Sequence, residues 1–287
     1  MQHFVSGGKR NYYGKGDVIV YRLNRDGKTP PHKCAVFGAN VLMLIYGDAF
    51  WPTYETGDNT GLIATDSMKN FIQRETMGFP GYDLESYVQF LGQRFLETYA
   101  QVEGLQVTAV EIPYGALEEG SAAFAPGGPE RATARIELRR AGAAVETVEL
   151  RSGIQGYRLL RLGGSAFYGF VRDRYTTLPE IHNRPLHMGL ALEWSYTDPA
   201  AAFSDGAITA QVGDLVRHTF QKFESGSIQQ IIYQLGQKVL AEIPQVAEVS
   251  LEAANRTWDT VCEQGDALGV YTDARPPVGV LGLTLRR

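Results

Sequence analysis

The side chains that most often carry enzyme chemistry are present in this sequence, but not at the spacings of the common catalytic motifs. No GxGxxG, GxxxxGK[ST], HExxH, CxxC or GxSxG pattern occurs. The histidines show no recurring ligand spacing, and His182 and His187 are separated by a proline and lack a surrounding cluster of carboxylates. We therefore expect no metal site, and chemistry that depends on neither a metal, a nucleotide nor a flavin.

One predicted helix start has the chemistry of an anion site. Thr65, Asp66 and Ser67 are favourable N-cap residue types and stand directly before the apolar positions of a helix. The first backbone N–H groups of a helix have no partner within the helix and favour anions. This segment could therefore hold an anionic ligand, or Thr65 could simply cap the helix.

The elements that must position such residues follow one order in the first half of the chain. The pattern predicts two strands, two helices and two further strands. They are expected at residues 17–22 and 33–46, from 65 and from 83, and at 105–114 and 132–138. In the second helix the apolar residues recur three or four positions apart, which places them on one face.

The second half repeats this order. Two short strands are expected within 157–171 around Gly163 and Gly164, a longer strand at 187–196, helices at 209–223 and from Ser227, and strands at 246–253 and 278–285. We find no residue-level identity between the halves, so the repeat is one of pattern. The prediction is an α+β protein of two ββααββ domains, 11–150 and 151–287, with antiparallel sheets and helices on one face. Open sheet edges predict closure by oligomerisation.

Composition excludes several classes of partner. The 287 residues carry a formal net charge of -5, with lysine and arginine scattered, which argues against nucleic-acid binding. We find neither a basic leader nor a run of about eighteen apolar residues, so we expect no membrane segment. Cys34 and Cys262 are expected to be reduced, buried thiols. The chain lacks a terminal Ser-Lys-Leu, and we expect a cytoplasmic protein.

Four segments, taken in register, carry a resemblance to a known family. They are Tyr13-Gly14-Lys15-Gly16-Asp17-Val18; Gly57-Asp58-Asn59 with 64–70; 167–173 with 175–178 and Asn183-Arg184-Pro185-Leu186; and Ser227-Ile228-Gln229 with Asn255. Each alone is weak. In this order and spacing they resemble the urate oxidase (uricase) family, in particular its bacterial members, over essentially the whole chain.

The resemblance implies a fold and an activity. Members have two tunnelling-fold domains per subunit, and two subunits close a barrel that stacks into a homotetramer. They oxidise urate with dioxygen to 5-hydroxyisourate and hydrogen peroxide in purine degradation, with no cofactor and no metal. Urate, dioxygen and water are the substrates, and each site lies at a subunit interface, where residues 15, 65 and 66 of one chain face the others.

Substrate binding is carried over onto matching positions. The planar donors of Arg184 suit the C2 carbonyl and adjacent ring nitrogen of urate. The amide of Gln229 reads the opposite lactam edge. Phe167 stacks on the purine plane and Ile228 closes the pocket wall. The alternatives are a surface ion pair, a solvated helix side chain and ordinary packing.

Catalysis is carried over in the same way. Thr65 and Asp66 hold the five-membered ring, and the Thr65 hydroxyl serves Lys15 as a proton relay. Asn255 holds dioxygen, and later the attacking water, above the ring. Each has a plain alternative: a capping threonine, a solvated lysine and an asparagine that ends a strand.

One departure and two rival functions accompany this assignment. Many members place a histidine two residues after the asparagine, where this chain has Thr257, which cannot titrate near neutral pH. The first rival is a tunnelling-fold enzyme acting on pterins or other purines, anchored by a glutamate such as Glu242 or Glu248. The second is a non-catalytic binder or structural barrel that kept the fold without the relay.

Overall fold

The computed structural model describes residues 11–25, 35–119, 121–204, 206–265 and 267–287. The chain forms two compact units. The first contains the residues up to Gly153 together with Ser195–Ala207, and the second contains Ile154–Trp194 and Ile208–Arg287. Cys34 and the first two residues of the strand expected at 33–46 lie outside the described residues.

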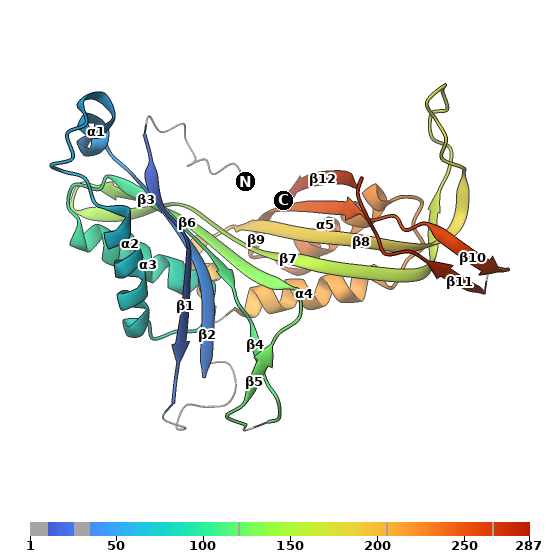
Figure 1. Ribbon diagram of the computed structural model, residues 1–287, viewed down its shortest axis with the longest axis horizontal. Helices are drawn as coiled ribbons and strands as arrows, with labels where there is room; N and C mark the ends of the chain where they lie inside the picture. The colour runs from blue at the N-terminus through green and yellow to red at the C-terminus, as the bar shows by residue number, and fades with distance from the viewer. Residues whose placement is uncertain (1–10, 26–34, 120, 205, 266) are drawn as a thin grey trace. The chain divides into compact units, whose positions relative to one another are not determined.

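The first unit is an antiparallel sheet with two helices on one face (Figure 1). Its strand order is β1-β2-β3-β6, continued by the beginning of β7. Helix α2 packs against β1, and α3 packs against β3 and β6. The bounds are β1 Tyr13–Leu23, β2 Val36–Tyr46, η1 Asp48–Phe50, α1 Trp51–Thr56, α2 Thr65–Glu75, η2 Thr76–Gly78, α3 Leu84–Thr98, β3 Gly104–Glu111, β4 Tyr114–Ala116, β5 Phe124–Pro126 and β6 Arg131–Ala141.

The second unit repeats the arrangement with the rest of β7, followed by β8, β9 and β12. Helix α5 packs against β9 and β12. The bounds are β7 Ala144–Phe167, β8 Ile181–Tyr196, η3 Pro199–Ala202, α4 Ala207–Phe220, α5 Ile228–Glu242, β9 Val246–Asn255, β10 Thr260–Gln264, β11 Leu268–Tyr271 and β12 Gly279–Arg286. The α+β class and the doubled ββααββ order are confirmed, since each unit has two strands, two helices and two strands in sequence.

Three expectations about the elements were wrong or incomplete. The two short strands within 157–171 are one strand, β7, that ends at Phe167. Gly164 adopts a φ of 73°, so the glycine pair bends the strand instead of ending it. Helix α1 and the β10–β11 hairpin were not expected. Cys262 lies on β10 and is exposed, because every residue of that short strand is exposed.

The halves also share residues, which corrects the expectation of a repeat in pattern only. Leu91-Gly92-Gln93 in α3 and Leu235-Gly236-Gln237 in α5 are identical. A Cβ on Gly92 would lie 2.7 Å from Leu138 Cδ1, and a Cβ on Gly236 would lie 2.8 Å from Leu285 Cδ1. Both glycines therefore allow a leucine of the sheet to approach the helix, so the two units share one packing solution.

An arginine near the end of a strand caps the second helix of each unit in the same way. Arg140 and Arg287 each donate to carbonyls at and beyond the C-terminus of the second helix, where those groups lack helical partners. The acceptors are Leu96, Tyr99 and Val102 for Arg140, and Leu240, Ile243 and Val246 for Arg287. This repeated cap fixes the helix against the sheet in both units.

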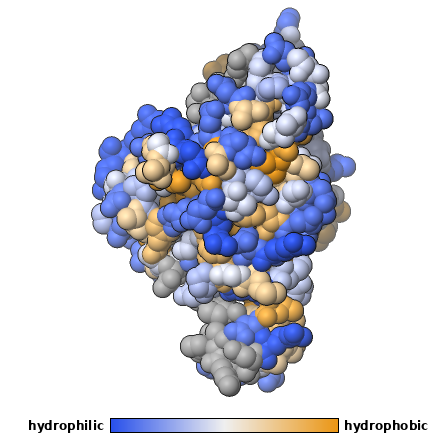
Figure 2. All heavy atoms as spheres, turned by 90° about the vertical axis from the view of Figure 1, so that its left-hand side faces the viewer, coloured by the Kyte–Doolittle hydropathy of each residue, from blue (hydrophilic) through white to orange (hydrophobic). Residues whose placement is uncertain are grey.

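The helices of the first unit are amphipathic, with a hydrophilic outer surface and an apolar buried side. Seen from the end that carries α1, α2 and α3, hydrophilic side chains predominate and apolar ones show in separate patches (Figure 2). The buried side of α3 includes Leu84, Leu91 and Phe95. Among the described residues, no helix combines the length and apolar character needed to cross a bilayer.

Candidate active site

A bulge in β1 determines which way Lys15 points. Lys15 pairs with Met43, and the next regular pair joins Val18 to Val41, so the register shifts between them. Met43 and Val41 are both fully buried and lie two residues apart, on the same face of β2. The extra residue in β1 therefore puts Lys15 and Val18 on that same buried face. Asp17, within the bulge, adopts a left-handed φ of 54°.

The start of α2 lies beside this lysine. Helix α2 begins at Thr65, its N-cap is Ala64, and no side chain caps it. Within the described chain the Thr65 hydroxyl has no hydrogen-bond partner, so the alternative of a capping threonine is wrong. The N–H groups of the first turn and this hydroxyl are left for a ligand or solvent.

Asp66 links the helix start to Lys15 electrostatically. Its carboxylate accepts hydrogen bonds from Lys69 Nζ at 2.5 Å and Asn70 Nδ2 at 2.9 Å. Lys69 first, and then Asn70 and the charge of Lys15, lower the pKa of the Asp66 carboxyl below its ordinary value. The structure therefore brings Lys15, Thr65 and Asp66 together in the first unit.

In the second unit, three hydrogen bonds around Gly164 join the segments that carry the other candidates. Gly164 N donates to Asn183 Oδ1 at 2.8 Å, and Ser225 N donates to Gly164 O at 2.9 Å. Ala166 N donates back to Ser225 O at 2.7 Å. These bonds hold the end of β7, the start of β8 and the turn before α5 together, which are the segments of Phe167, Arg184 and Gln229.

Arg184 is the strongest binding candidate in this cluster. It alternates in phase with Leu186 and Met188, which are buried at 2% and 0% exposure, so its side chain lies on the helix side of β8. Its Nε is buried without a hydrogen-bond partner, and within the described residues no carboxylate pairs with it. Burial lowers the pKa of the Arg184 guanidinium. The surface ion pair considered as an alternative is wrong.

The other substrate-binding candidates differ in what they offer. The ring of Phe167 stacks on Phe170, with centroids 4.9 Å apart and planes 14° apart. Gln229 is exposed at the second position of α5, with its amide free of partners among the described residues. Ile228 is 5% exposed and belongs to the buried face of α5, so its ordinary packing role is real.

Asn255 is the last residue of β9, where the strand meets β8 and β12. It pairs with Gly279 of β12, and the next residue, Arg256, donates its N–H to His187 O at 3.2 Å. Asn255 alternates in phase with the buried Leu251 and Ala253, which places it on the helix side, as Arg184 is. The second unit thus places Arg184 and Asn255 on the same side of its sheet.

His187 does not take the place of the family histidine. Thr257 is exposed. His187 alternates with the buried Leu186 and Met188, so its ring lies on the opposite face of the sheet from Arg184. That ring stacks on Trp258 with centroids 5.5 Å apart. Burial and then the charge of Arg256 lower its pKa.

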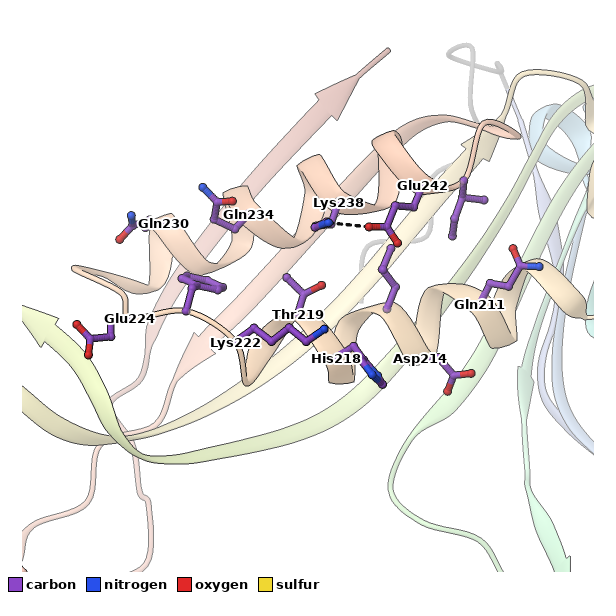
Figure 3. Close-up of a pocket in the computed structure, with 13 residues that line it drawn as sticks. Gln211, Asp214, His218, Thr219, Lys222, Glu224, Gln230, Gln234, Lys238 and Glu242 are labelled. Carbon is purple, nitrogen blue, oxygen red and sulfur yellow. Dashed lines mark hydrogen bonds and ion pairs between the residues drawn. The ribbon is translucent and has the colours of Figure 1, made fainter.

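A cavity of about 720 Å³ lies elsewhere, between α4 and α5 (Figure 3). None of the predicted site residues lines it. Lys238 Nζ and Glu242 Oε1, one turn apart on α5, form an ion pair at 2.6 Å along one wall of this cavity. Among the described residues, no group of three or more histidine, cysteine or acidic side chains could hold a metal ion.

Sequence reasoning missed the residues that assemble these clusters. The Asn183 side chain accepts a hydrogen bond from Gly164 N, Ser225 bonds to β7 through its backbone, and Tyr13 accepts a hydrogen bond from Ile63 N at 3.0 Å. The only signal was that Asn183 and Tyr13 stand within the motifs around Arg184 and Lys15.

These features define a class first. Two tandem ββααββ units, each with an antiparallel sheet covered by helices on one face, are the architecture of tunnelling-fold proteins. Comparison with known proteins then places the chain within that class. The family model described as Uricase matches residues 150–281. The uricase of Haloferax volcanii is 36% identical over 96% of this chain and 97% of its own length. The chain belongs to the uricase family.

Further relatives agree. The "Uric acid degradation bifunctional protein PucL" of Bacillus subtilis is 37% identical over 96% of this chain, which spans only 60% of that protein. A second bifunctional relative, from Bacillus sp. (strain TB-90), is 34% identical over 93% of this chain, which spans 58% of it. The crystal structure of a uricase from Bacillus fastidious has a TM-score of 0.88 at 32% identity, covering 97% of this chain and 94% of that one.

Proposed function

We propose that this protein oxidises urate with dioxygen to 5-hydroxyisourate and hydrogen peroxide, with neither cofactor nor metal. The observation that carries the proposal is the half-buried Arg184, which has a buried Nε without a hydrogen-bond partner and no anionic partner within the described chain, on the same side of the sheet as Asn255. A buried donor without a partner is costly unless a ligand completes it. Urate is a planar anion with the acceptors that a guanidinium fork binds.

Binding uses the rest of the second unit. Phe167 gives an aromatic plane at the end of β7, and it exchanges its stacking partner Phe170 for the purine. Gln229 offers both a donor and an acceptor to the opposite edge of the ring. Ile228 forms the wall beneath them. Together with Arg184 they orient a flat heterocycle.

Chemistry uses the first unit. Lys15, acting as the general base, takes a proton from the urate anion through the Thr65 hydroxyl, while the N–H groups at the start of α2, with Asp66, hold the five-membered ring. The resulting dianion gives an electron to dioxygen, and the two radicals combine into a C5 peroxide anion, which takes the proton back from Lys15 to become a hydroperoxide. Its C–O bond breaks, water held by Asn255 adds at C5, and the proton that this water gives up completes hydrogen peroxide. Two electrons pass from urate to dioxygen, and the protein supplies orientation and electrostatics.

Each complete site needs two chains in this proposal. The sheet edges are open: β1 ends the first unit's strand order and exposes Ile19, Tyr21 and Leu23, and β12 ends the second unit's order and exposes Val280. Apolar side chains on an unpaired edge favour pairing with another subunit. We propose a homotetramer in which Lys15, Thr65 and Asp66 of one subunit face the binding residues of its neighbour.

The alternative of a pterin enzyme requires a glutamate that anchors the heterocycle. Glu242 Oε1 pairs with Lys238 at 2.6 Å and lines the α4–α5 cavity, and Glu248 Oε2 pairs with Arg286 at 2.5 Å. Neither glutamate lies in the Arg184 cluster, so neither is placed to hold a heterocycle there.

The direct test follows the loss of the ultraviolet absorption of urate and the release of peroxide by protein stripped of metal with a chelator. We expect equal amounts of urate consumed and peroxide formed. Activity that disappears on chelation and returns with a metal would overturn the cofactor-free proposal. Tight binding of an azaxanthine with no urate turnover would favour a non-catalytic binder, and selective binding of neopterin would favour the pterin reading.

A further inference from the structure

Tyr13 ties β1 directly to the turn that leads into α2. Its hydroxyl accepts a hydrogen bond from Ile63 N at 3.0 Å, and its ring meets Phe50 edge-on, with centroids 5.2 Å apart and planes 86° apart. Phe50 is 1% exposed and Ile63 is 5% exposed, so the contact lies against the core. Burial raises the pKa of the Tyr13 hydroxyl, which stays protonated at neutral pH.

The spacing of these residues relates this bond to the proposed proton relay. Tyr13 and Lys15 are two apart on β1 and pair with Ile45 and Met43 of β2, so both lie on the buried face. Ile63 likewise precedes Thr65 by two residues. The Tyr13–Ile63 hydrogen bond is therefore the contact next to the place where Lys15 meets the start of α2.

The strand has little freedom to adjust if this bond is lost. A Cβ on Gly14 would lie 1.8 Å from Met43 O, so β1 runs close to β2 between Tyr13 and Lys15. The helix start has no cap of its own, since Ala64 makes no side-chain capping bond. The side-chain hydrogen bond to Ile63 thus holds a helix start that lacks local support.

We infer that Tyr13 is a positioning residue that sets the separation between Lys15 and the Thr65 hydroxyl. This inference rests on the proposed function and identifies a residue that tunes its proton transfer. Tyr13 touches neither substrate nor oxygen in this scheme. Its hydroxyl acts through Ile63 and the start of α2.

The test substitutes Tyr13→Phe, which keeps the ring on Phe50 and removes only the hydroxyl. We expect kcat to fall about ten- to a hundredfold, the scale of a small misplacement of a catalytic group. The KM for urate and the Kd for 8-azaxanthine should change little, since their main contacts belong to the second unit. The loss should therefore appear in kcat and not in KM, a split that a general loss of the fold would not produce.

The matched control is Tyr54→Phe. Tyr54 donates its hydroxyl to Tyr12 O at 3.0 Å in the same region but is not joined to the start of α2 by that bond. It should leave both kcat and KM unchanged. Equal effects of the two substitutions would overturn the inference, as would a Tyr13→Phe protein with normal kcat.

A double-mutant cycle with Lys15→Met separates this inference from the function beneath it. If Tyr13 acts through Lys15, Tyr13→Phe should have no further effect on kcat in the Lys15→Met protein. If Lys15→Met reduces kcat but Tyr13→Phe acts equally in both backgrounds, the tyrosine is only structural and the inference is wrong. If Lys15→Met itself leaves kcat unchanged, the proposed relay fails first. Thermal unfolding of each variant shows whether it is folded.

Discussion

Replacing Arg184 with methionine should raise stability and lower activity at the same time. The guanidinium has a buried Nε with no hydrogen-bond partner, so the ligand-free protein carries an unsatisfied donor at this site. Such a group costs about 1–3 kcal/mol when its partner is missing. Methionine has a similar length and no polar atom to satisfy. We expect the free energy of unfolding to increase by about 1 kcal/mol and Tm to rise by roughly 2–4 °C.

The loss of activity follows from the same side chain. A guanidinium fork that makes two hydrogen bonds to anionic urate contributes about 1.5 kcal/mol or more for each. Losing both therefore costs about 3 kcal/mol in transition-state stabilisation, a decrease of roughly 150-fold in kcat/KM. The assay combines urate consumption with thermal unfolding at one fixed protein concentration.

The control for both measurements is Arg158→Met, which removes an exposed arginine from the neighbouring strand β7. It should leave kcat/KM unchanged and should not raise Tm. The reasoning would be refuted if Arg184→Met destabilised the protein, because the guanidinium would then have a structural partner. Unchanged kcat/KM would refute the assignment of Arg184 to substrate.

Three further predictions test other parts of the structure. Lys15→Met should lower kcat about 10²- to 10⁴-fold, the usual contribution of a general base, with azaxanthine binding retained in a binding titration. Gly236→Ala should lower the free energy of unfolding by about 1–3 kcal/mol in denaturant titrations, because its Cβ would lie 2.8 Å from a leucine methyl, whereas Gly115→Ala, with open space around it, should not. Lys69→Met should raise the pKa of Asp66 in an NMR titration, since Lys69 is the main cause of its lowered value. The stabilisation from Asp66 is present above the unfolded-state pKa, near pH 4, and is lost as pH falls through the lower folded-state pKa, so this acid dependence should weaken in the variant.

Much of the fold was readable from the chain because it depends on local periodicity. The second helices were expected from 83 and from Ser227, and the structure places them at Leu84–Thr98 and Ile228–Glu242, with Asp83 and Ser227 as their N-caps. The repeated Leu-Gly-Gln was also present in the sequence. Its meaning became clear only when each glycine was seen against a leucine of the sheet.

The candidate site was readable only as a set of residue types. Sequence motifs named Lys15, Arg184 and Asn255, but not the direction in which any of them points. A one-residue bulge in β1 determines the side of the sheet on which Lys15 lies. In β7, the left-handed Gly164 allows the strand to continue where a pair of glycines predicted that it would end.

The sequence alone thus determined the α+β fold class, the order of strands and helices, and the motifs that indicate the family. What only the tertiary structure decided is that the Arg184 Nε is buried without a partner among the described residues, and that Lys15 lies beside an uncapped helix start. The physical reason is that both depend on strand register and on hydrogen bonds between residues far apart in the chain. Residue type and local spacing cannot determine these contacts, because a shift of one residue in register moves every side chain of a strand to the opposite face.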